Sequence, residues 1–111
     1  MVDLVNGIYA HWPSTQVLDA VHLPLCEGLH SASIDLAYYG PLAELDVPKE
    51  VHVSAGVVRA ADTVDRMRLA LDAAEQMANR GQLGVSCPCG MGRRPADVGV
   101  IMERLVALAN S

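Results

Sequence analysis

An amphipathic segment at positions 62–79 stands between two short apolar runs, at 50–58 and 83–87. Its apolar side chains recur every three or four residues, which is the spacing of one buried face of a helix. A helix between two buried strands is typical of a βαβ unit, because adjacent parallel strands need a long crossover. This segment therefore constrains the fold more than any other part of the chain.

The rest of the chain is interpreted as further copies of the same unit. Residues 2–10 and 32–39 have the β-branched and aromatic composition of strands, and residues 14–24 and 95–108 have helical spacing. We predict an α/β fold of four βα units with a parallel sheet, half of a TIM-type barrel, in a single domain over residues 1–111. The mean repeat of about 28 residues (111/4) is close to the roughly 31 of a full barrel. A doubly wound open sheet is the alternative.

Composition narrows the class of protein. Hydrophobic residues make up 51% of the chain and charged residues 19%, which excludes disorder, and no apolar run reaches the roughly 18 residues of a membrane span. The net charge of −5 argues against nucleic acid as a partner. The start of the chain lacks the pattern of a signal peptide, and three cysteines are an odd number. We therefore expect a cytoplasmic protein with reduced thiols and no membrane association.

Three of the predicted strand ends carry side chains that could bind a metal. In parallel α/β proteins the reactive side chains gather where strands end, and here these residues are His11, Asp35 and the pair Cys87 and Cys89. Asp35 lies in a predicted buried strand, where a carboxylate is costly unless it is paired or metal-bound. For the two cysteines the alternative is that they are small buried residues.

The remaining histidines and the arginines before the last helix are interpreted as packing, surface or substrate-binding residues. His22 and His30 are interpreted as surface or packing residues, and His52 alternates with valines on a predicted strand, where it would face the opposite layer. The glycine-rich loop before the last helix contains Arg93 and Arg94, which would bind the carboxylate or phosphate of a substrate. The alternative for this loop is a solvated connection without a ligand.

Several motifs in order resemble the C-terminal half of the zinc-bearing catalytic (β/α)8 barrel domain of cobalamin-independent methionine synthase. Residues 53–58 (VSAGVV) resemble the strand of that family that reads GVVD, and residues 66–71 (RMRLAL) resemble its "RI..AL" helix. Residues 83–91 (LGVSCPCGM) resemble a strand ending NPDCGL. Upstream, residues 10–13 (AHWP) resemble an H-x-C strand end, and residues 33–35 (SID) resemble SIE.

The resemblance implies a zinc-dependent thiol methyl- or alkyltransferase, or a subunit of one, in which zinc turns a small thiol substrate into a thiolate. Carried over by position, the zinc ligands are His11, Asp35 and Cys89, with Cys87 as a candidate fourth. Asp35 replaces the glutamate of the family, and Pro13 stands where the family has its first cysteine. A second interpretation is a non-catalytic half-barrel with a degraded metal site. A third is a small-molecule binding module that uses the two arginines for an acidic ligand.

Half of a barrel would leave two strand edges unpaired and the inner face of its sheet uncovered. Unpaired edges and exposed apolar area favour association. We therefore expect a homo-oligomer, or a complex with a polypeptide that supplies the other half-barrel.

Overall fold

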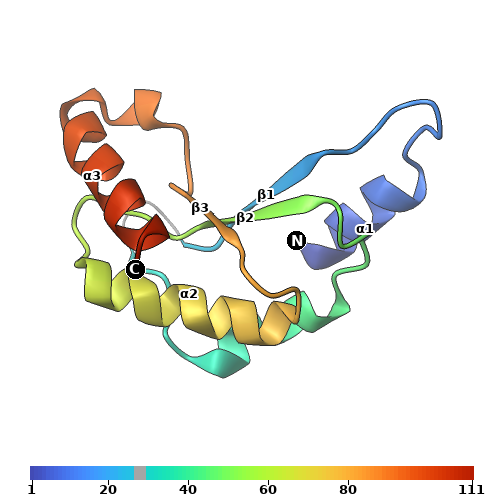
Figure 1. Ribbon diagram of the computed structural model, residues 1–111, viewed down its shortest axis with the longest axis horizontal. Helices are drawn as coiled ribbons and strands as arrows, with labels where there is room; N and C mark the ends of the chain where they lie inside the picture. Colours follow the sequence, from blue (N-terminus) through green and yellow to red (C-terminus); the bar gives the residue numbers. More distant parts are fainter. Residues whose placement is uncertain (27–29) are drawn as a thin grey trace.

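The computed structural model describes residues 1–26 and 30–111. Three short parallel strands, α-helices and 3-10 helices (labelled η) follow one another along this part of the chain (Figure 1). Their order is α1 (Val2–Ala10), β1 (Ala20–Pro24), η1 (Leu36–Glu44), β2 (His52–Gly56), α2 (Val64–Ala78), β3 (Gly84–Ser86), η2 (Met91–Arg93), η3 (Pro95–Asp97) and α3 (Val98–Ala109).

The three strands form one parallel sheet in the order β1–β2–β3. In this register Leu23 of β1 lies opposite Ala55 of β2, and Ala55 lies opposite Val85 of β3. The central strand β2 therefore supplies the backbone partners of both of the others. The carboxyl ends of all three strands lie at the same edge of the sheet, because the strands are parallel.

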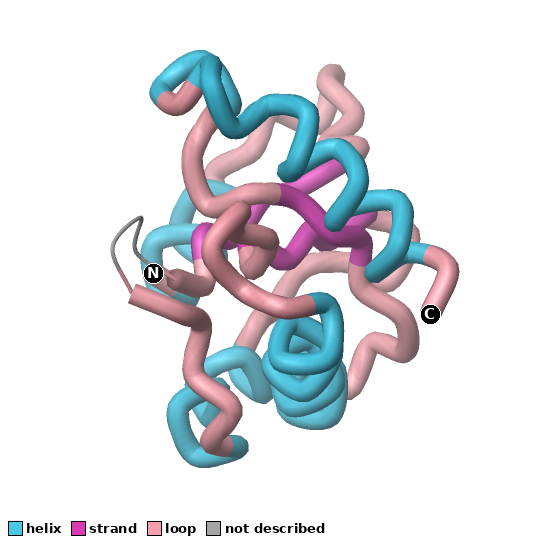
Figure 2. The backbone as a smooth tube through the Cα atoms, turned by 90° about the vertical axis from the view of Figure 1, so that its left-hand side faces the viewer, coloured by secondary structure: helices cyan, strands magenta, loops and turns pink. Residues whose placement is uncertain are grey.

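The two faces of the sheet differ in how they are covered. Leu23, Val53 and Ala55 are buried on the face that packs toward α2, and α2 in turn packs against η1. The alternate side chains of β1 and β2, among them His22 and His52, are exposed on the other face. Helix α3 contacts β3 and α2, and Figure 2 shows the strands between α2 and α3.

The βαβ unit predicted from the sequence is confirmed. β2, α2 and β3 lie within the predicted ranges 50–58, 62–79 and 83–87. Helix α2 begins after Thr63, whose Oγ1 accepts a hydrogen bond from the backbone N–H of Arg66 at 3.2 Å. It ends at Asn79, which adopts the left-handed conformation with φ of 51°.

A single arginine ties the end of this unit to its beginning. Beyond Asn79, Arg80 donates hydrogen bonds of 2.7 to 2.8 Å to the backbone carbonyls of Val47, Pro48 and Val51. These carbonyls belong to the segment that leads into β2. The connection from α2 to β3 is therefore fixed against the amino end of the sheet.

The prediction of four βα units, and with it the half-barrel, is wrong. Residues 2–10 form helix α1 and no strand. Val2 is buried and Val5 and Tyr9 pack against the core, which is the i, i+3, i+7 spacing of one helix face. The β-branched and aromatic composition of this segment suggested a strand, but the spacing of the residues that pack inward decided the structure.

The second predicted unit is also different. Leu23 and Leu25 are buried at every second position, as in a strand, whereas Val17, which was expected on the helix face, is 83% exposed. Residues 20–24 therefore pair with β2 where a helix was predicted. The predicted strand 32–39 gives way to η1, because Asp35 caps its first turn and Pro41 cannot donate to a ladder.

Within the described ranges no helix has the length and apolar character needed to cross a membrane.

The burial of α2 leads to a prediction about stability. Leu71 is 2% exposed, and Leu69, on the same helix, is 55% exposed. Leu71→Ala should lower the free energy of unfolding by about 2–5 kcal/mol, because it leaves a cavity in the core. Leu69→Ala should change it by less than about 0.5 kcal/mol. Urea denaturation measures both, and equal effects would contradict the packing described here.

Candidate functional site

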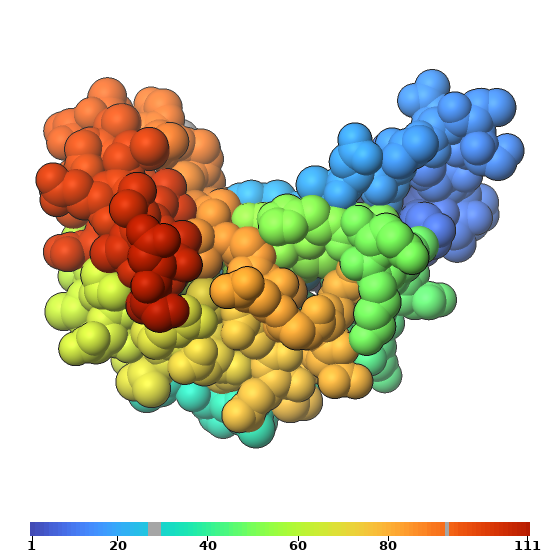
Figure 3. Space-filling model, viewed as in Figure 1, coloured from blue at the N-terminus to red at the C-terminus, as the bar shows by residue number. Residues whose placement is uncertain are grey.

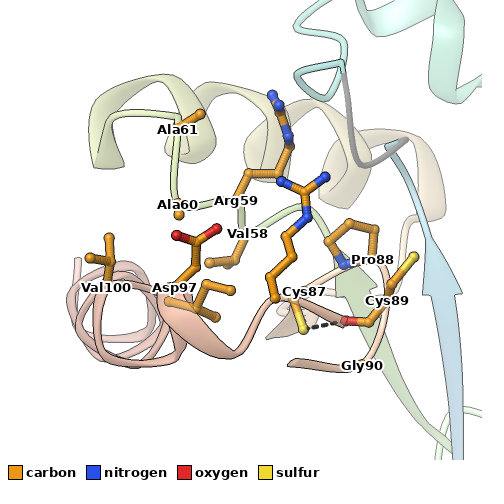
Figure 4. A pocket seen from close by; sticks show the side chains of 12 residues that line it. Val58, Arg59, Ala60, Ala61, Cys87, Pro88, Cys89, Gly90, Asp97 and Val100 are labelled. Atoms are coloured by element: carbon orange, nitrogen blue, oxygen red, sulfur yellow. Dashed lines mark hydrogen bonds between the residues drawn. The ribbon is translucent and has the colours of Figure 1, made fainter. Parts of the chain in front are cut away.

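A cavity of about 580 Å³ opens beyond the carboxyl ends of β2 and β3. Three segments line it: residues 58–61 after β2, residues 87–90 after β3, and positions between 94 and 101 around the start of α3 (Figure 4). This is the edge at which open parallel sheets bind their ligands. Its volume falls within the range of about 300–1,000 Å³ that is typical of small-molecule sites.

The pocket wall begins where β2 continues past its last paired residue. Val57 and Val58 are fully buried, and the backbone N–H of Val58 donates to the carbonyl of Ser86 at 3.0 Å. This bond keeps the chain after β2 alongside the end of β3. Arg59 follows directly and is therefore placed at the edge of the cavity.

A small polar network holds Arg59. Its Nη1 donates to Ser31 Oγ at 3.0 Å and lies 3.2 Å from Asp62 Oδ1, which also accepts from Ser31 Oγ at 2.6 Å. Asp62 is only 8% exposed, and a carboxylate at such a position is costly unless it is paired. The network joins the loop after β2 to the segment before η1, and it restricts the orientation of the Arg59 side chain.

Two cysteines lie on the side of the pocket formed after β3. The Cys87 thiol donates to the backbone carbonyl of Cys89 at 2.6 Å, and Cys89 itself is exposed. Figure 4 shows Val100 and Asp97 on one side of the cavity and Cys87, Pro88 and Cys89 on the other.

A third thiol comes from the end of β1. Cys26 donates to the carbonyl of Gly56 at 3.5 Å. Burial raises the pKa of Cys26 to about 11; the charge of Arg59 opposes this rise, while Asp62 and the two other cysteines add to it. Near neutral pH Cys26 is therefore a protonated thiol.

The charges around the pocket favour a negatively charged ligand. Among the described lining residues three are charged: Arg59, Arg94 and Asp97. Arg59 also pairs with Asp62, so the positive character of this spot comes from its two guanidinium groups and not from an excess of cations over anions. The first turn of α3 also faces the cavity with Val100 and Ile101, and a helix N-terminus adds partial positive charge.

The structure brings two of the four predicted metal ligands together. Cys87 and Cys89 both line the pocket. His11 instead follows the last turn of α1, where its Nδ1 lies 2.9 Å from the carbonyl of Gly7. Asp35 is exposed, and its carboxylate accepts from the backbone N–H of Ala37. Within residues 1–26 and 30–111 no three His, Cys, Asp or Glu side chains are grouped in a way that could hold a metal ion.

Of the two arginines predicted to bind substrate, Arg94 lines the pocket. The side chain of Arg93 lies outside the described part of the structure. Sequence reasoning missed Arg59 and Asp97. The signal for Arg59 was available, since it is the first polar residue after the two valines that follow the central strand.

Comparisons of the chain with protein-family models, with curated proteins and with solved structures gave no match.

The three thiols should differ in reactivity. At pH 8 we expect iodoacetamide to alkylate Cys89 first, because it is exposed, and Cys26 last. With a pKa of about 11, only about one Cys26 in a thousand is a thiolate at that pH. Mass spectrometry of peptides from timed reactions measures the order. In concentrated urea all three should react alike, and equal rates in the folded protein would contradict the burial of Cys26.

The network around Arg59 can be tested by removing one charge. Asp62→Asn should lower the free energy of unfolding by about 1–3 kcal/mol, because a buried charged partner of Arg59 and Ser31 is lost. Asp72 forms a matched control: it pairs with Arg68 at 3.0 Å but is 54% exposed. Asp72→Asn should cost less than about 1 kcal/mol. Urea denaturation measures the free energy of unfolding of both variants. A larger loss in Asp72→Asn than in Asp62→Asn would refute the structural role of Asp62.

Proposed function

We propose that this chain binds a small organic acid with an apolar body in the pocket beyond β2 and β3. The observation that carries the proposal is that two guanidinium groups, those of Arg59 and Arg94, line one cavity of a chain whose net charge is −5. Hydrogen bonds from a guanidinium to a carboxylate are short and strong, and their planar geometry gives specificity.

The rest of the pocket lining suits the apolar body of such a ligand. Val58, Val100 and Ile101 offer apolar surface, and the thiols of Cys87 and Cys89 lie on the opposite wall. Most small-molecule sites combine an apolar lining with a few fixed polar groups in this way. The network that holds Arg59 supports the proposal, because a fixed guanidinium loses less freedom when a ligand binds.

The free thiols and the net charge support two further parts of the proposal, a reducing compartment and a ligand other than nucleic acid. All three cysteines are free, which favours a reducing compartment such as the cytoplasm. The net charge of −5 favours a small acid over nucleic acid as the ligand.

Binding can be measured with 3-phenylpropanoate as the probe and its neutral amide as the control ligand. We expect a dissociation constant of about 10–500 µM for the acid by titration calorimetry, and much weaker binding of the amide. Arg94→Gln should weaken binding of the acid about tenfold, because a charge-assisted hydrogen bond is lost.

Lys49→Gln is the matched control variant for this titration. It removes the same charge but lies before β2, at the other edge of the sheet, where Lys49 donates to the carbonyl of Asn79. It should leave the affinity unchanged. If acid and amide bind alike, or if both variants weaken binding equally, the pocket is not an acid site.

The methionine synthase resemblance gives a second proposal, zinc-dependent thiol methyl- or alkyl transfer. It is supported by the position of Cys87 and Cys89 on one wall of a ligand-sized cavity. The donor set carried over from the family does not fit this arrangement as it stands, because His11 and Asp35 are engaged at the ends of α1 and η1.

Zinc binding remains a prediction with its own test. If the resemblance reflects function, protein prepared in medium with zinc should carry about one zinc per chain, and Cys89→Ser should lose it. Elemental analysis together with the protein concentration gives the number of zinc ions per chain. A metal-free protein, or zinc that is retained in Cys89→Ser, would reject this second proposal and leave acid binding unaffected.

A further inference from the structure

The face of the sheet that points away from α2 forms the floor of a broad hollow. Figure 3 shows this hollow between α3 on one side and the N-terminal part of the chain on the other, with β1 and β2 below it. The strand residues on this face include Ala20, His22, His52 and Ser54. Ala20 and both histidines are exposed.

The floor is a connected polar surface to which all three strands contribute. Ser54 Oγ donates to Ser86 Oγ at 2.9 Å, and Ser86 Oγ lies 3.3 Å from Nδ1 of His22. The register explains this chain of contacts, because His22 lies opposite Ser54, and Ser86 lies opposite Gly56, two residues further along β2.

Two glycines on this face allow the histidine rings to lie flat against the sheet. A Cβ atom at Gly84 would collide with the ring of His52, and one at Gly56 would lie 2.9 Å from Nε2 of His22. Both imidazole rings therefore lie against glycine backbone and do not project from the sheet. The floor itself is therefore flat, and a partner reaches it by entering the hollow between α3 and the N-terminal part of the chain.

The charge of this face indicates which partner can approach. Its strand side chains are Ala20, His22, Pro24, His52, Ser54 and Ser86, and none of them is a lysine, arginine, aspartate or glutamate. A second copy of a chain with net charge −5 is repelled from most of the surface. A neutral patch can meet itself across a two-fold axis without like charges coming together.

The exposed area points in the same direction. The chain exposes 6669 Å², whereas a folded monomer of 11.8 kDa exposes about 5,900 Å². The fold therefore leaves about 750 Å² more surface uncovered than a typical monomer of this size, and a standard interface covers roughly 800 Å² on each partner. The radius of gyration, 14.1 Å, also exceeds the roughly 13 Å expected for this length.

We propose that the open face of the sheet binds the same face of a second copy, which makes a two-fold symmetric dimer. Helices α1 and α3 also carry exposed apolar side chains. These are Leu4 and Ile8 on α1, and Met102 and Val106 on α3. This dimer does not depend on the acid site, whose pocket lies beyond the strand ends.

Analytical ultracentrifugation from 5 to 200 µM in 150 mM salt tests the dimer. The wild-type protein should approach about 24 kDa, twice the chain mass of 11.8 kDa, as its concentration rises. Ala20→Arg places a long, charged side chain on the edge strand β1 of this face in both copies, and should raise the dimer dissociation constant at least about tenfold. Gln76→Arg, at an exposed position of α2 on the covered side, should leave it unchanged.

A second measurement on the unaltered protein guards against misfolding of the Ala20→Arg variant. Amide hydrogen exchange of residues 20–24 and 52–56, followed by mass spectrometry, should slow between 5 and 200 µM, while exchange in α2, on the other side of the sheet, serves as the reference. A monomer at 200 µM overturns the proposal. A dimer whose dissociation constant is the same in Ala20→Arg and Gln76→Arg, or one without slower exchange in these strands, overturns the choice of face.

Discussion

The pairing of β2 with a parallel strand on each side is the constraint on which the rest of this structure depends. Because β1 and β3 both bond to β2 and run in the same direction, their carboxyl ends meet at one edge. Val53 and Ala55 bury one face of the sheet toward α2, and Arg80 fixes the return of the chain into β3. The candidate site and the open face are both consequences of this arrangement.

At the carboxyl edge of the sheet, the chain after β2 stays beside the end of β3 beyond the last paired residues. The bond between Val58 and Ser86 keeps two loops parallel after their strands end, and this places Arg59 across from Cys87. The buried carboxylate of Asp62 holds this guanidinium in place. Two guanidinium groups line this cavity of an acidic chain, which is why the proposed ligand is an acid.

The βαβ unit could be predicted because the helical spacing of 62–79 is unambiguous and its flanking runs are too short for anything but strands. The first 45 residues were misread because composition was given more weight than spacing: Val2, Val5 and Tyr9 look like strand residues but share one helix face. The errors at the site follow from this. Cys87, Cys89 and Arg94 follow correctly placed elements and line the pocket, whereas His11 and Asp35 were assigned to the ends of strands that do not form.

The most direct test of the parallel sheet is a set of nuclear Overhauser effects between backbone protons of β1, β2 and β3. The register predicts contacts that link Leu23 to Ala55 and Ala55 to Val85, the pattern of parallel neighbours, together with sequential amide contacts of a helix through residues 2–10. The close contacts between facing Cα protons that mark antiparallel strands, or a strand over residues 2–10, would contradict the account at its foundation.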